Sequence, residues 1–372
     1  MSYQSDHDKY GDFFNSYSPN RQRPTQNRQP NQSNRPPKRK KRRLKRSVKF
    51  AFGVIAIGLV VLIISLSVSK CSDDSDNKAK SQSVPSDTTS TVNTEPEDKI
   101  NRPQSADYTV TLGNQIESTH AVLVDSSTDT ILARRNADKQ IYPASMTKVM
   151  TLLVAAENIT DYNQTFKMTS KIIDPVYRLD LTLAGFCPNE EVKIIDMMYG
   201  MTLESGAEAA VGLAVHVAGS EEEFVKLMNQ KCKELGLTNT NFTNVSGQHN
   251  KNHYTTAIEM AMIMKAAIKN PLCREILSTE YYTVPKNDFH DELKFHSGMF
   301  EKMHGNEPEV ATIKGGKTGF TAQSLFCLVS FAVTDDGREI ICVTAQGERK
   351  YSPVYDCIEL YKDYTHPVKG DS

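Results

Sequence analysis

An apolar stretch at residues 50–69 contains no charged residue. Val, Ile, Leu, Ala and Gly dominate it. An α-helix rises about 1.5 Å per residue, so a helix over this stretch would span the hydrocarbon core of a bilayer, which is about 30 Å thick. The sequence therefore predicts one transmembrane helix, with the rest of the chain divided between the two sides of a membrane.

Basic residues gather just before this stretch, from Lys38 to Arg46. Residues 1–49 contain 14 Lys and Arg against three Asp, although the whole chain has a net charge of −1. Such a run is also typical of nucleic-acid patches and localisation signals. Because it adjoins the apolar stretch, the positive-inside rule explains it better and predicts a cytoplasmic N-terminus. We expect a single-pass cell-membrane protein with an extracytoplasmic C-terminal part and no nucleic-acid partner.

The segments on either side of the predicted helix have compositions typical of disorder. Residues 1–49 read as a basic cytoplasmic tail, and no A-x-A-like cleavage site follows the apolar stretch, so we expect an uncleaved anchor. Residues 70–106 are mostly Ser, Thr, Asp, Asn and Lys, which predicts an extracytoplasmic linker. A folded domain is expected at residues 107–366, followed by a short tail at 367–372.

Ser145 and Lys148 form the first motif with a chemical implication. The apolar residues that follow recur at helical spacing to about Asn158, so Ser145 is expected to open a helix and to share one face of its first turn with Lys148. A serine hydroxyl becomes a nucleophile when a neighbouring base takes its proton, and a lysine can be that base when burial lowers its pKa. The alternative is an N-cap serine beside a surface lysine.

Two further motifs follow in order, Ser205-Gly206-Ala207 and Lys317-Thr318-Gly319. S-x-x-K, S-x-N and K-T-G together are the signature of penicillin-binding proteins and class A β-lactamases. The sequence resembles the serine-type D-alanyl-D-alanine carboxypeptidases, the low-molecular-weight penicillin-binding proteins. The stretches that carry the resemblance are Pro143 to Lys148, Met197 to Ala210, Asn252 to Ala257, and Lys317 to Thr321.

The resemblance implies a hydrolase that removes the terminal D-alanine from peptidoglycan stem peptides and is inhibited by β-lactam antibiotics. Ser145 would attack the carbonyl of the penultimate D-alanine to form an acyl-enzyme. Lys148 would be the general base, and Ser205 would relay a proton to the leaving amine. No cofactor is implied.

The third motif would hold the substrate. Lys317 and Thr318 would bind its terminal carboxylate, and Gly319 would keep the strand open for the substrate to lie alongside. Backbone N–H groups of Ser145 and Phe320 would form the oxyanion hole. The alternative for Lys317 to Gly319 is a surface strand end before a turn.

One departure from the family pattern is Ala207, where the family has asparagine. Alanine lacks the acceptor and the two donors of that amide. The loss of these groups favours, as an alternative, a catalytically weakened relative that binds peptidoglycan or penicillin. A β-lactamase is less favoured because no clear E-x-x-L-N pattern is present. Ser205 has its own alternative, as the N-cap of a helix over residues 207–218.

The order of the predicted elements indicates an α+β fold. Strands are expected at residues 119–125, 130–134, 311–320, 325–334 and 338–346, with helices between the two groups. This arrangement predicts an antiparallel sheet flanked by helices. The resemblance implies the same, a penicilloyl-serine-transferase (β-lactamase-like) fold with K-T-G on an edge strand, here preceded by one transmembrane helix.

Two helix starts carry capping residues, Ser220 three residues before Glu223 and Thr256 three residues before Glu259. The seven cysteines form no recognisable framework. Cys327 and Cys342 lie in apolar strands and are expected to be core residues. No C-x-x-C or H-E-x-x-H pattern is present, so no metal site is predicted.

Overall fold

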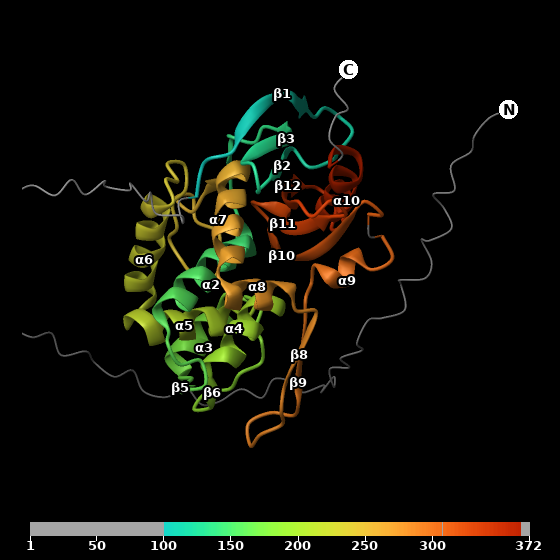
Figure 1. The fold of residues 1–372 in the computed structure, drawn as a ribbon. Coiled ribbons are helices and arrows are strands. Elements are labelled where there is room, and N and C mark those ends of the chain that lie inside the picture. Colours follow the sequence, from blue (N-terminus) through green and yellow to red (C-terminus); the bar gives the residue numbers. More distant parts are fainter. Residues whose placement is uncertain (1–99, 307, 366–372) are drawn as a thin grey trace, which may run out of the picture. The chain divides into compact units, whose positions relative to one another are not determined.

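Residues 100–306 and 308–365 are described by the structure, a computed structural model (Figure 1). The predicted cytoplasmic tail, the transmembrane helix, the linker as far as residue 99 and the C-terminal tail lie outside these residues. Within the described part of the chain, none of the helices is both long and apolar enough to cross a membrane.

A six-stranded sheet forms the centre of the domain, in the order β1-β3-β2-β12-β11-β10. Its strands are β1 (Gln104–Thr111), β2 (His120–Asp125), β3 (Thr130–Arg135), β10 (Ala311–Thr321), β11 (Leu325–Thr334) and β12 (Glu339–Gly347). Three short two-stranded sheets lie outside it: β4 (Gln140–Ile141) with β7 (Thr255–Thr256), β5 (Thr165–Lys167) with β6 (Glu191–Lys193), and β8 (Tyr281–Val284) with β9 (Leu293–His296).

The sheet is antiparallel with one exception, which corrects the prediction. β1 pairs with β3 in parallel, with Gln104 opposite Thr130. Most of the β1 side chains are exposed or half-buried, as on an edge strand, so no continuous apolar face marked it in the sequence.

The folded domain also starts earlier than residue 107. Ile100 is buried, and β1 begins at Gln104. Arg102 donates from Nη1 to the fully buried Glu259 at 3.2 Å and from Nη2 to Asp138 at 2.9 Å. Residues 100–106 are therefore part of the domain and not of the linker.

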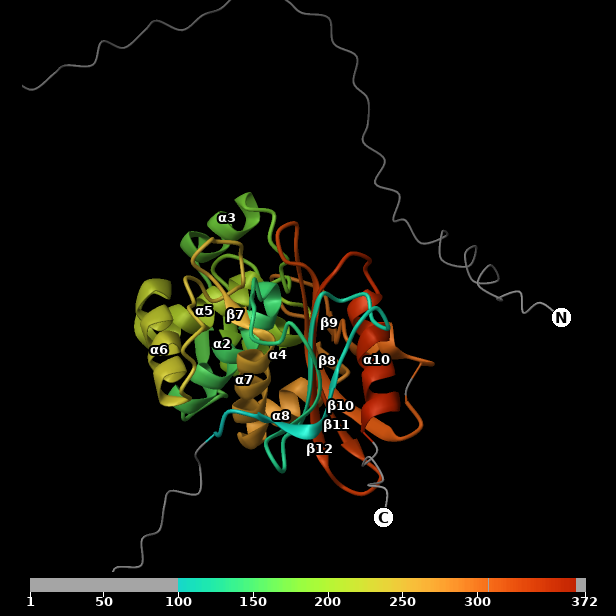
Figure 2. The same cartoon turned by 90° about the horizontal axis from the view of Figure 1, so that it is seen from above.

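Helices cover both faces of the sheet, as Figures 1 and 2 show. The helices are η1 (Ala144–Met146, a 3-10 turn), α2 (Thr147–Asn158), α3 (Ser170–Arg178), α4 (Ile194–Leu203), α5 (Ala207–Ala218), α6 (Glu221–Glu234), α7 (Ala257–Lys269), α8 (Pro271–Ser278), α9 (Phe300–Met303) and α10 (Ser352–Tyr364). α10 packs on one face, and α7 together with the bundle around α2 packs on the other.

Successive side chains of β11 lie on opposite faces of the sheet, which explains this two-sided packing. Val329 and Phe331 belong to the apolar cluster shared with α2 and α7, whereas Leu328 and Ala332 belong to the cluster under α10. Cys327 and Cys342 likewise belong to different clusters on opposite faces, and both are buried free thiols. The prediction that they are core residues is confirmed.

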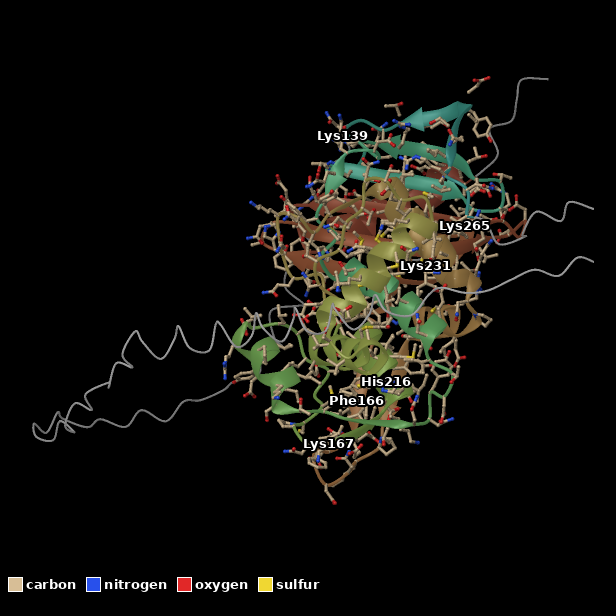
Figure 3. All side chains as sticks on the ribbon, turned by 90° about the vertical axis from the view of Figure 1, so that its left-hand side faces the viewer. Lys139, Phe166, Lys167, His216, Lys231 and Lys265 are labelled. Carbon is tan, nitrogen blue, oxygen red and sulfur yellow. The ribbon has the colours of Figure 1, made fainter. Side chains whose placement is uncertain are left out.

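Polar and aromatic contacts join elements of the helical part to one another (Figure 3). Lys231 of α6 lies 2.7 Å from the carboxylate of Glu157 in α2. Phe166 of β5 meets His216 of α5 edge to face, with ring centroids 5.8 Å apart. The ion pair thus ties α6 to the C-terminal end of α2, and the ring contact ties β5 to α5.

Candidate active site

Ser145 lies in the η1 turn that leads directly into α2. Pro143 precedes this turn, and Ala144 adopts a positive φ of 47°. The N-caps of η1 and α2 are Pro143 and Met146, and neither makes a side-chain capping bond. The interpretation of Ser145 as a capping serine is therefore wrong.

Lys148 is buried, with 3% of its surface exposed, which excludes a surface lysine. Its Nζ donates to Ser145 Oγ at 3.1 Å and to the carbonyl oxygen of Ser246 at 2.7 Å. Burial lowers the pKa of Lys148 to about 7, and the negative charge of Glu208 acts in the opposite direction. An amine with this pKa is partly neutral near neutral pH and can accept the serine proton.

A tight turn supplies the second partner of Lys148. Asn244 Oδ1 accepts from the N–H groups of Ser246 at 3.2 Å and Gly247 at 2.8 Å. Gly247 has a φ of 86°, and a Cβ there would lie 1.8 Å from the carbonyl oxygen of Ala144. This contact requires glycine. Sequence reasoning missed Ser246, because it acts through its backbone.

Ser205 occupies the loop between α4 and α5 with a φ of 65°. A non-glycine residue in this region is uncommon, and such strain gathers at functional sites. The N-cap of α5 is Gly206, without a side-chain capping bond, so the capping alternative for Ser205 is wrong. Ser205 lines the same cavity as Ser145 and Lys148.

Glu208 is a buried residue of the site that sequence reasoning did not assign. It is fully buried in the first turn of α5, and its Oε1 accepts from the N–H groups of Ala184 at 2.7 Å and Gly185 at 2.9 Å. Burial raises its pKa, although these backbone N–H groups favour the carboxylate. Glu208 therefore ties the segment around Ala184 to the Ser205 loop.

Strand β10 brings the third motif to the nucleophile. A Cβ on Gly319 would lie 2.9 Å from the Pro143 carbonyl oxygen and 3.0 Å from the Ser145 nitrogen. We expected Gly319 to leave room for substrate. The structure gives a different reason for glycine here, the close approach of β10 to η1.

Two lysine side chains, the buried Lys317 and the half-buried Lys302, line one cavity of the cleft. Lys317 has 4% of its surface exposed and donates to the Thr318 carbonyl oxygen at 3.1 Å. Its pKa is lowered by burial and by the positive charges of Lys148 and Lys302. Lys302 of α9 donates to the Gly298 carbonyl oxygen, and burial lowers its pKa as well. Sequence reasoning missed Lys302, because no motif surrounds it.

Three cavities meet along this cleft, with volumes of about 550, 280 and 210 Å³. Ser205 and Thr182 line all three. Lys302, Lys317 and Thr318 line the largest. Phe320 is 54% exposed and stacks on Phe326, with ring centroids 4.3 Å apart.

The site residues named from the sequence thus converge on one cleft. No group of His, Cys, Asp and Glu side chains suited to a metal ion occurs among the residues that the structure describes. The arrangement, a serine beside a buried lysine with two further lysine side chains lining the cleft, suits acyl transfer from a substrate that carries a carboxylate.

Comparisons with known proteins agree with this chemistry. A family profile described as D-alanyl-D-alanine carboxypeptidase, Peptidase_S11, matches residues 105–348. D-alanyl-D-alanine carboxypeptidase DacF of Bacillus subtilis is 32% identical over 240 residues, which are 61% of this chain and 57% of the relative. DacC of Escherichia coli is 32% identical over 60% of this chain and 55% of its own length. The chain therefore spans little more than half the length of these relatives.

Solved structures share the fold. The DD-transpeptidase of Streptomyces K15 superposes with a TM-score of 0.60 at 24% identity, over 67% of this chain and 97% of that one. Penicillin-binding protein 5 of Haemophilus influenzae gives a TM-score of 0.57 at 28% identity, over 67% of this chain and 70% of that one. The mixed α/β fold with a sheet flanked by helices is thus that of penicillin-binding proteins.

Proposed function

The chain belongs to the D-alanyl-D-alanine carboxypeptidase family, Peptidase S11, and on that premise we propose that it removes the terminal D-alanine from peptidoglycan stem peptides. The observation that carries the proposal is the 3.1 Å hydrogen bond between the buried amine of Lys148 and the hydroxyl of Ser145. It unites a nucleophile with a base whose pKa is about 7.

In the proposed reaction Ser145 Oγ attacks the carbonyl carbon of the penultimate D-alanine. Lys148 accepts the hydroxyl proton, and Ser205 passes a proton to the leaving amine as the peptide bond breaks. Water then hydrolyses the acyl ester and restores Ser145. The nitrogen of Ser145, close to Gly319 on β10, and that of Phe320 would donate to the developing oxyanion.

The terminal carboxylate would bind at the end of the cleft where Lys302, Lys317 and Thr318 line the largest cavity. Lys317 has no carboxylate partner among the hydrogen bonds and ion pairs of the described residues, and burial disfavours its charged form. An anionic substrate would supply the missing counter-charge. β-Lactams carry a carboxylate and a reactive carbonyl, and we propose them as inhibitors that acylate Ser145.

A weakened, binding-only relative is the second candidate, because Ala207 supplies no polar atom to the site. The contact of Lys148 with the Ser246 carbonyl oxygen speaks against it, since the base keeps a second hydrogen-bond partner without an asparagine.

Residues 50–69 would anchor the protein in the cell membrane, with the N-terminus in the cytoplasm and the catalytic domain outside.

The test is D-alanine release from a pentapeptide that ends in D-Ala-D-Ala, with Ser145→Ala as the control. The carboxypeptidase proposal predicts release by the wild type and none by the variant. A folded wild type that is acylated by penicillin but releases no D-alanine would support the binding-only candidate instead.

A further inference from the structure

The motif that begins at Ser205 offers no side chain at position 207 for one part of the proposed substrate. A stem peptide brings a second amide next to the carbonyl that Ser145 attacks, on the side of the acyl group. Ala207 is 2% exposed and ends in a methyl group, so it can neither donate to this amide nor accept from it. The inference below rests on the proposed function, because it concerns how the same site binds its peptide.

Gln248 lines the cavity of about 210 Å³ that also contains Ser145, Lys148, Ser205 and Ala207. Among the described residues that line this cavity, Gln248 alone carries a carboxamide. A carboxamide offers one acceptor and two donors, the same groups that are missing at Ala207.

The backbone of Gln248 is held firmly beside the nucleophile. Its carbonyl oxygen accepts from Asn244 Nδ2 at 2.8 Å, and its N–H donates to Ser246 Oγ at 3.3 Å. The preceding Gly247 packs against η1, and the ring of the following His249 meets Tyr142 edge to face, with centroids 4.6 Å apart. The loop thus presents Gln248 from a fixed position, which lowers the entropic cost of binding a ligand.

The side chain of Gln248 is half-buried, and its amide takes part in none of the hydrogen bonds that the described residues form with one another. Among the other polar side chains of this cavity, Asp180 and Thr182 are exposed, and the Thr321 hydroxyl already donates to Ser324 Oγ at 2.9 Å. Asp180 can only accept when ionised, and the Thr182 hydroxyl has a single donor. Gln248 is therefore the group best suited to bind both atoms of a peptide amide.

We propose that Gln248 is a substrate-binding residue whose carboxamide hydrogen-bonds the acyl-side amide of the stem peptide, a role that the side chain at position 207 cannot perform. The carboxamide that binds the substrate would then come from the loop after Gly247 and not from the loop after Ser205. Specificity for a peptide amide next to the scissile bond follows from this contact.

A double-mutant cycle tests the proposal in the full chain. The variants are Gln248→Leu, which keeps the volume without the amide, Ala207→Asn, and the two combined. Gln230→Leu on the exposed face of α6 is the matched control, since its side chain bonds only Glu234 of the same helix. D-Alanine release gives kcat and KM for each, and the rate of acylation by a fluorescent penicillin gives a second measure.

Loss of one neutral hydrogen bond predicts a fall in kcat/KM of up to about tenfold for Gln248→Leu, mainly through KM. Ala207→Asn is expected to be at least as active as the wild type and to restore most of the loss in the double variant. Gln230→Leu should match the wild type, and melting curves show that each variant folds.

Two outcomes would overturn the inference. One is a Gln248→Leu variant that matches the wild type in both assays. The other is a loss on Gln248→Leu that is equally large in the wild-type and in the Ala207→Asn background, because independent effects would mean that the two positions do not share a role. The proposed function fails separately, if the wild type neither releases D-alanine nor is acylated.

Discussion

The chemistry of the site depends on the surroundings of one residue, Lys148. An ammonium group in water would be charged at neutral pH and useless as a base. Here burial removes most of its hydration, and the groups that contact it directly are the neutral Ser145 hydroxyl and the Ser246 carbonyl oxygen. His253 lies nearby, and burial together with the charges of His249 and Lys148 lowers its pKa to about 4, so it adds no charge at neutral pH.

The pH dependence of acylation follows from this environment. Because Lys148 has a pKa of about 7 and acts when neutral, the rate of acylation should rise with pH through about 7. The negative charge of Glu208 raises the pKa of Lys148, so Glu208→Gln should lower it and move the midpoint to lower pH. The measurement is the acylation rate by a fluorescent penicillin from pH 5 to 9.

Glu259→Gln is the matched control for this prediction. Glu259 is also a fully buried carboxylate in the first turn of a helix, and it accepts from the backbone N–H groups of Thr238 and Asn239. It lines none of the three cavities of the cleft. Its replacement should leave the midpoint in place. A midpoint that is the same in all three proteins would contradict the role assigned to Lys148 and Glu208.

At the level of elements, the site is assembled where β10 crosses the η1 turn. Neither element alone forms a cleft, since the nucleophile comes from the turn and Lys317 with Thr318 from the strand. Their separation is set by Gly319, because a Cβ there would lie 2.9 Å from the Pro143 carbonyl oxygen and 3.0 Å from the Ser145 nitrogen. The strand can approach the turn this closely because no side chain stands between them.

Gly319→Ala should therefore separate the two elements while leaving the fold intact. The added Cβ meets backbone atoms at 2.9 and 3.0 Å, which cannot move without shifting Ser145. A displacement of about 1 Å at a reacting atom can cost about 100-fold in rate, so we expect a loss of acylation of that order. Stopped-flow acylation with a circular dichroism melting curve measures both properties.

Gly113→Ala provides the comparison, because a Cβ there would meet only the flexible side chain of Gln115, at 3.2 Å. It should acylate at the wild-type rate. A Gly319→Ala variant that is equally fast would show that the contact between β10 and η1 does not set the geometry of the site.

At the scale of the whole molecule, local patterns in the sequence were sufficient to predict where many helices and strands lie. The capping residues Ser220 and Thr256 accept from Glu223 and Glu259 N–H groups, each at 3.1 Å, as predicted. The three C-terminal strands also agree with their sequence patterns, because β11 and β12 are long and mostly buried on both faces, whereas β10 begins with alternating buried and exposed residues.

Features that depend on contacts between distant segments could not be predicted. β1 is an exposed edge strand whose partner lies about 25 residues away, and its polar composition resembles a linker. Ser246, Glu208 and Lys302 enter the site through backbone contacts or burial, which no local pattern records. The motifs predicted the residues to which we assign the reaction, and the fold brings the residues that contact them.

The transmembrane helix at residues 50–69 stays a prediction, and it complements the proposed function. A catalytic domain outside the membrane would reach peptidoglycan, and an anchor with a linker would keep it near the cell surface. The described domain begins at residue 100, so the linker would contribute at most residues 70–99 to that reach.

The proposed function depends on Ser145 as the nucleophile, and the covalent adduct with a penicillin can be detected by mass. The protein is incubated with benzylpenicillin, and the intact mass and the modified peptide are determined by mass spectrometry. We predict one penicilloyl group on Ser145, and none on the Ser145→Ala variant. An unmodified wild type, or a modification on another residue, would show that Ser145 is not the nucleophile.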